Sequence, residues 1–122
     1  MIRRLLTPES QKDPYSWASA FGAHYWIALG PWGVIAIGWT QWTAAWVVPL
    51  LYLVCWEGLQ LYLQKRVTRA LVWDSILDTT GVALACYSAA CLGNDLKLSA
   101  VSCWGASLIV AAVGWRVREA RK

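Results

Sequence analysis

The amino-acid sequence predicts an all-α protein, a polytopic transmembrane bundle of four helices. Hydrophobic residues make up 58% of the 122-residue chain and charged residues only 15%, whereas a soluble domain is typically about 45–50% apolar and about 25% charged. The apolar residues gather in four runs, each close to the roughly 20 residues that a helix needs to cross a bilayer. The same composition excludes an intrinsically disordered chain, which would be poor in apolar and aromatic residues.

Each run gives one expected span. The first covers residues 22–39, and the second covers residues 44–63, where Pro49 lies early enough in the helix to be tolerated. The third covers residues 71–92 and carries two aspartates. The fourth covers residues 99–115 and is short but uncharged.

Two short basic segments flank the predicted transmembrane domain, which covers residues 22–115. Residues 1–21 form a cytoplasmic or interfacial arm that lacks the apolar stretch of a cleavable signal peptide. Residues 116–122 form a basic cytoplasmic tail. We therefore expect an arm, one helical domain and a tail.

Lysine and arginine are distributed unevenly between the two sides of such a bundle. Cytoplasmic loops of membrane proteins carry an excess of these residues. Of the 11 basic residues, all but Lys97 fall on one side of a four-span arrangement, which predicts that both termini are cytoplasmic. The residues on that side are Arg3, Arg4, Lys12, Lys65, Arg66, Arg69, Arg116, Arg118, Arg121 and Lys122.

Charge and cysteine content argue against two other classes of protein. The formal net charge is +4, but the basic residues form short clusters beside apolar runs, which is typical of segments facing a membrane rather than nucleic acid. The four cysteines lie in apolar runs without CxxC spacing, and His24 is the only histidine. Because neither set has the ligand spacing of a metal centre, we expect no metal and no cofactor.

Three acidic residues fall inside the predicted spans. An ionisable group within a span costs a few kcal/mol and needs either a partner or a function. Glu57 and Gln60 are three residues apart and share one face of the second span near its cytoplasmic end. Asp74 and Asp78 are four residues apart and share one face of the third span near its cytoplasmic start.

Because the spans alternate in direction, these residues should reach a similar depth in the inner half of the bilayer. One interpretation is a structural clamp, in which the carboxylates share protons or pair with nearby cations. The other is a headgroup or substrate site, in which the carboxylates act as acid–base groups and an arginine meets an anionic headgroup. The expected cluster comprises His24, Glu57, Gln60, Arg69, Asp74 and Asp78.

The order of these polar residues resembles the VanZ-like family of small integral membrane proteins. The family pattern has a histidine before an aromatic residue, then Glu-x-x-Gln, an arginine, and Asp-x-x-x-Asn-x-x-Gly. The resemblance implies a cell-envelope protein of the bacterial cytoplasmic membrane, in a family associated with low-level teicoplanin resistance. The corresponding residues are His24-Tyr25, Glu57 with Gln60, Arg69, and Asp74 with Asp78 and Gly81, so that Asp78 replaces the family's asparagine.

Three functions are compatible with these observations. The first is a VanZ-like envelope protein that binds a lipid or a lipid-linked precursor. The second is a bacteriophage holin, which small size, several spans and a basic tail would suit. The third is a subunit of a larger membrane complex, whose helices pack against a second copy of the chain or against another membrane protein. No nucleophile motif or phosphate-binding loop accompanies Glu57 and Asp74, so a non-enzymatic role is favoured, although the two could form an acid–base pair.

Overall fold

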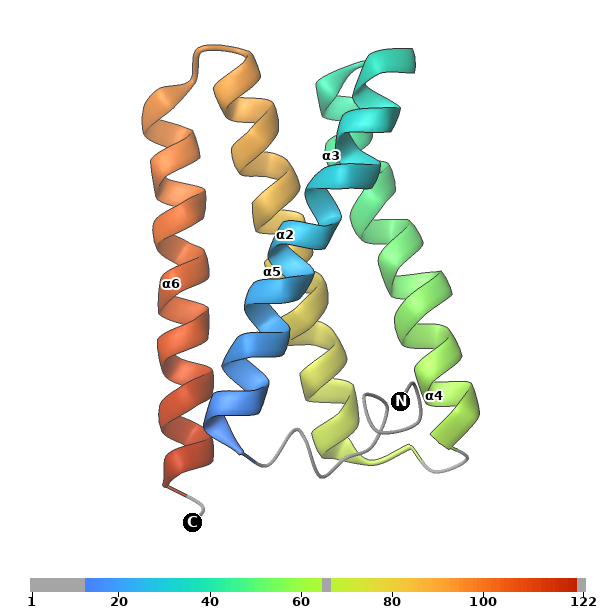
Figure 1. Cartoon of the computed structure of the whole chain (residues 1–122), viewed down its shortest axis with the longest axis vertical. Coiled ribbons are helices and arrows are strands. Elements are labelled where there is room, and N and C mark those ends of the chain that lie inside the picture. Colours follow the sequence, from blue (N-terminus) through green and yellow to red (C-terminus); the bar gives the residue numbers. More distant parts are fainter. Residues whose placement is uncertain (1–12, 65–66, 121–122) are drawn as a thin grey trace.

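The structure, a computed structural model, describes residues 13–64 and 67–120 (Figure 1). These residues form helices and contain no strand, and four of the helices are long and apolar enough to cross a membrane. The predicted all-α class with four spans is confirmed. The second span is continuous but changes its helix type twice along its length. The elements are α2 (Pro14–Gly38), α3 (Gln41–Leu51), the π-helix η1 (Tyr52–Glu57), α4 (Gly58–Gln64), α5 (Arg69–Gly93) and α6 (Lys97–Glu119).

The first and last spans are longer than the sequence predicted. Helix α2 begins at Pro14 because the Asp13 side chain accepts a hydrogen bond from the Ser16 backbone N–H, and proline suits a first helical position. Residues 14–21 therefore form the first turns of α2, and the first 12 residues of the predicted arm lie outside the described part. Helix α6 continues to Glu119, so the predicted tail begins inside a helix.

Both ends of the described chain lie at the same end of the bundle, together with the start of α5 (Figure 1). Seven of the ten basic residues assigned to the cytoplasmic side fall outside the described ranges. The other three, Arg69, Arg116 and Arg118, lie toward this end, whereas Lys97 begins α6 at the opposite end. In this part of the chain, the basic residues therefore separate by side as the sequence predicted.

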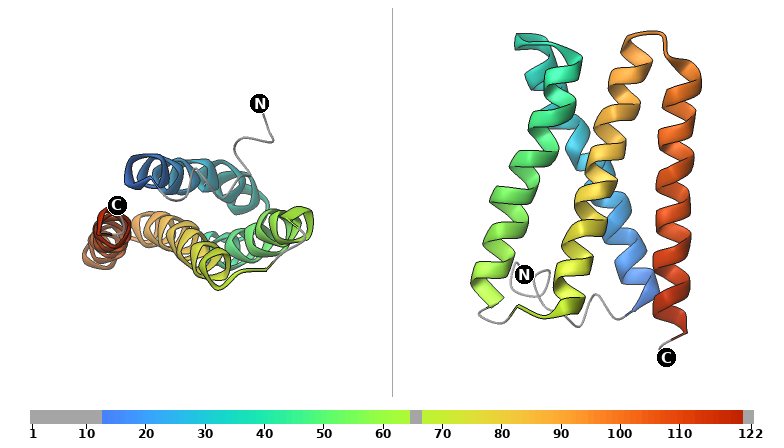
Figure 2. Two further views of the ribbon diagram at one scale, coloured as in Figure 1. Left: turned by 90° about the horizontal axis from the view of Figure 1, so that it is seen from below. Right: turned by 180° about the vertical axis from the view of Figure 1, so that it is seen from behind.

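Helix α5 is the centre of the bundle. Seen along the helices, α4, α5 and α6 follow one another in a row, and α2 crosses one face of that row (Figure 2). Helix α5 packs against α2, α3, α6 and η1. Within the apolar 18-residue stretch of α5, 44% of the residues are buried inside the bundle, compared with 11–22% in the corresponding stretches of the other three spans. Helix α5 thus positions side chains that must meet partners from several helices.

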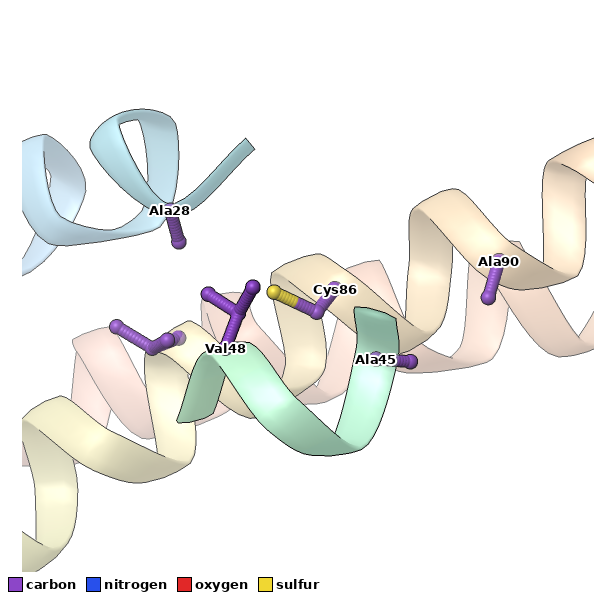
Figure 3. Close-up of a cluster of buried hydrophobic side chains, with 6 residues drawn as sticks. Ala28, Ala45, Val48, Cys86 and Ala90 are labelled. Carbon is purple, nitrogen blue, oxygen red and sulfur yellow. The ribbon is translucent and has the colours of Figure 1, made fainter. Parts of the chain in front are cut away.

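Small side chains allow this close packing. The apolar core contains Ala28 of α2, Ala45 and Val48 of α3, and Cys86 and Ala90 of α5, together with Val82 of α5 (Figure 3). Small residues let helix backbones approach closely in a membrane, where the hydrophobic effect does not drive helices together.

Helix α2 crosses the bundle obliquely, with its first turns beside α6 and its last turns beside α3 (Figure 1). Near its start, the Trp17 ring lies against Gly114 of α6, where a β-carbon would overlap the ring. One turn later, Phe21 lies against Gly81 of α5, and a β-carbon there would be only 2.7 Å from the ring carbon Cε2. Two glycines therefore set how closely α2 approaches its neighbours at this end.

At the other end, α2 and α6 diverge and leave an apolar groove of about 350 Å³. Its lining includes Trp26 of α2, Ala89 of α5 and Trp104 of α6. The hydroxyl of Ser88 in this lining donates a hydrogen bond to the Ala100 carbonyl. With that hydroxyl occupied, the groove presents a largely apolar surface to the hydrocarbon of a membrane.

Candidate functional site

The π-helix η1 places a buried acid beside a tyrosine. At 3.6 residues per turn, residues five positions apart lie on different faces of an α-helix. In η1 the hydrogen bonds widen to a five-residue spacing, as between the Gly58 N–H and the Leu53 carbonyl. Tyr52 and Glu57 consequently share a face, and the Tyr52 hydroxyl donates to Glu57 Oε1 at 2.6 Å.

Glu57 is almost fully buried, at 2% exposure. Its second oxygen, Oε2, accepts a hydrogen bond from the Ser75 hydroxyl of α5 at 2.5 Å. Both carboxylate oxygens thus accept a hydrogen bond from a hydroxyl group. This acid is held between the second and third spans by two hydroxyl groups.

His24 of α2 connects this acid to a second one. Its Nδ1 lies 3.2 Å from the Tyr52 hydroxyl oxygen and 3.6 Å from Asp78 Oδ2. Because the single hydroxyl hydrogen of Tyr52 is directed to Glu57, its oxygen accepts from His24, and Nδ1 therefore carries a hydrogen. We call the connected side chains of His24, Tyr52, Glu57, Ser75 and Asp78 the polar network.

Asp78 is the incompletely satisfied member of the polar network. The residue is 8% exposed, and its Oδ1 is a buried atom without a hydrogen-bond partner. Buried polar atoms normally have such a partner. The described residues therefore leave this oxygen without a hydrogen-bond donor.

Asp74 belongs to a separate group on the α6 side of α5. Its Oδ1 accepts hydrogen bonds from the Arg118 guanidinium at 2.5 Å and from Trp17 Nε1 at 3.0 Å. The guanidinium carbon also lies 4.0 Å from the centre of the Trp17 ring, within the range of a cation–π interaction. We call Trp17, Asp74 and Arg118 the ion-pair group, because it joins α2, α5 and α6 through a buried salt bridge.

The structure brings together only part of the predicted cluster. His24, Glu57 and Asp78 meet in the polar network, and Asp74 lies one turn away with Arg118. Gln60 is buried one turn after Glu57, but the described residues give it no hydrogen bond to the network.

Arg69 was predicted as the cation of the cluster. It is the exposed first residue of α5 and has no ion-pair partner in residues 13–64 and 67–120. Arg118 takes that role, because α6 extends beyond its predicted end and carries this side chain alongside the start of α5.

Sequence reasoning also missed Tyr52, Ser75 and Trp17. Ser75 directly follows Asp74 in the sequence. A polar residue at this position could have indicated that α5 presents polar side chains in a second direction, where Ser75 meets Glu57. Tyr52 gives no such signal, since only a π-helix aligns it with Glu57. Within the described ranges, no group of three or more histidine, cysteine or acidic side chains is placed to hold a metal ion.

Comparison of the chain with protein families, with curated proteins and with solved structures finds no match. The resemblance to the VanZ-like family stays a prediction from the order of the polar residues.

Replacing Tyr52 by phenylalanine should lower the free energy of unfolding by about 1–2 kcal/mol, because it removes the hydroxyl that bridges His24 and Glu57. Unfolding in mixed detergent micelles, followed by tryptophan fluorescence, measures this change. The matched control is Tyr62→Phe, since Tyr62 is 81% exposed on α4 and should be neutral. Equal stability of the two variants would show that the bridge does not contribute.

Proposed function

We propose that this multi-pass protein is a VanZ-like protein of a bacterial cytoplasmic membrane that binds the headgroup of a lipid or of a lipid-linked envelope precursor at the polar network. The observation that carries the proposal is the buried, unpartnered Oδ1 of Asp78. Such an atom is costly unless a partner is supplied. The described side chains supply none, which supports a partner from outside the chain.

The position of the network suits a lipid. The side chains of His24 and Asp78 are 20% and 12% exposed, so the network reaches the bundle surface. Along α5, Asp78 lies about 13 Å from Arg69, at about 1.5 Å per residue, in the half of the span nearer the described chain ends. A headgroup from that side of the membrane has the shortest route to it.

The same position argues against a pore. The polar network and the ion-pair group occupy one half of the bundle, whereas the described core toward the other end is apolar (Figure 3). A polar path through the described residues would need hydrophilic side chains along the whole span. This contrast favours lipid binding over a holin-type channel.

Retention of lipid tests the proposal. The full chain is reconstituted into vesicles of bacterial lipid extract and released into mild detergent, and bound lipids are counted by native mass spectrometry. Asp78→Asn and Glu57→Gln should each reduce bound lipid about tenfold, which corresponds to about 1.4 kcal/mol. Circular dichroism and size-exclusion profiles identify any variant that has lost its fold.

Asp95→Asn is the matched control. Asp95 lies in the turn between α5 and α6, at the opposite end of the bundle, and has a positive φ of 58°, which asparagine also tolerates. It makes the same chemical change without touching the network and should retain lipid. Equal retention by all variants, or co-purification of a protein in place of lipid, would refute the proposal.

A further inference from the structure

We infer that the polar network binds a primary ammonium group carried by a membrane lipid, and that it disfavours an anionic headgroup. This inference rests on the proposed function and specifies its ligand. It follows from the charges that face the network from each helix packed around it.

The three buried carboxylates differ in their partners. Asp74 is matched by Arg118 of α6. Asp78 of α5 lies beside His24 of α2, an imidazole that is charged only when protonated, and Glu57 of η1 has two hydroxyl partners but no paired cation among the described residues. Among the described residues, the polar network therefore holds two acidic side chains and one basic side chain.

A buried charge without a partner is strongly destabilising. A phosphate or carboxylate ligand would add a further negative charge to the polar network, so its binding would increase this cost. A cation removes the imbalance. Electrostatic complementarity therefore selects a positively charged ligand.

The geometry further favours an ammonium ion over a metal ion. The described residues offer no set of three acidic, histidine or cysteine ligands. An ammonium group needs only acceptors for its N–H donors, and Asp78 Oδ1 is an acceptor without a donor.

Aromatic rings stand beside His24, the neighbour of Asp78. The rings of Tyr52 and Trp56 lie 5.5 and 6.4 Å from that of His24, and Trp56 is 46% exposed. An exposed aromatic face beside the polar network adds a cation–π attraction for an approaching ammonium. A quaternary choline group could use this attraction but has no N–H to donate to Asp78.

Three lipids separate these contributions. The full chain is placed in phosphatidylcholine vesicles that contain equal minor amounts of phosphatidylethanolamine and phosphatidylglycerol, and the lipids retained on release are identified by native mass spectrometry. After correction for bulk abundance, phosphatidylethanolamine should be retained about tenfold over each of the others, as expected of one charge-assisted hydrogen bond. The preference should disappear in Asp78→Asn and persist in Asp95→Asn.

The outcomes distinguish this inference from the proposed function. Preference for phosphatidylglycerol, or equal retention of all three lipids, would overturn the ammonium site while leaving lipid binding intact if total retention still depends on Glu57. A preference for phosphatidylethanolamine that survives Asp78→Asn would also overturn it, because the amine would then bind elsewhere. If the unmodified chain retains no lipid at all, both the ammonium site and the proposed lipid binding are refuted.

Discussion

Replacing Asp74 by alanine is expected to lower the free energy of unfolding by about 3–5 kcal/mol, the range for breaking a buried salt bridge by removing one partner. The change removes the acceptor of both the Arg118 guanidinium and Trp17 Nε1. Three helices lose a common contact as a result. Unfolding in mixed micelles, with tryptophan fluorescence as the readout, gives the magnitude, and Arg116→Ala at an exposed site on α6 is the control.

A second variant separates the ion pair from the packing around it. Replacing both Asp74 and Arg118 by leucine removes the two charges together, and apolar replacement of a buried pair is often neutral or stabilising. We therefore expect the double variant to be more stable than Asp74→Ala. If both variants lose the same stability, the charges themselves are not what the fold depends on at this position.

Replacing Gly114 by alanine is expected to cost about 3 kcal/mol, at the upper end of the usual range for overpacking. The added β-carbon would overlap the Trp17 ring. That ring has little freedom to move, because it is 2% exposed, donates to Asp74 and lies under Arg118. The thermal stability of the detergent-solubilised chain measures the effect.

Gly105→Ala is the matched control on the same helix. A β-carbon at Gly105 meets nothing within 4 Å, and alanine is favoured over glycine within a helix by up to about 1 kcal/mol. This variant should be neutral or slightly stabilised. If Gly114→Ala behaves in the same way, α2 and α6 are not packed as closely as the Trp17 contact requires.

The spans and part of the site could be predicted because they depend on local sequence. Four apolar runs indicate four helices, and the four-residue spacing of Asp74 and Asp78 places both on one face of α5. Helix α2 begins before the apolar run that predicted the first span. The Asp13-Pro14 start signal lies among polar residues, and an apolar run alone does not include them.

Partners that are distant in sequence could not be predicted in the same way. Arg69 is the basic residue nearest to Asp74 in the sequence, yet Asp74 pairs with Arg118, 44 positions away. That choice depends on how α2 crosses the bundle and how far α6 extends. Tyr52 was missed because periodicity analysis assumes an α-helical repeat, which η1 does not follow.

The irregular middle of the second span makes its residue count as important as its residue types. Each residue of an α-helix turns the chain by about 100°. If the segment from Tyr52 to Glu57 wound as a regular α-helix at its present length, the five steps between the two residues would turn the acid about 140° away from the phenol. A deletion of one residue in this segment would leave four steps, which bring the acid back to within about 40° of the phenol, so a regular α-helix can hold the two together only in a span that is one residue shorter.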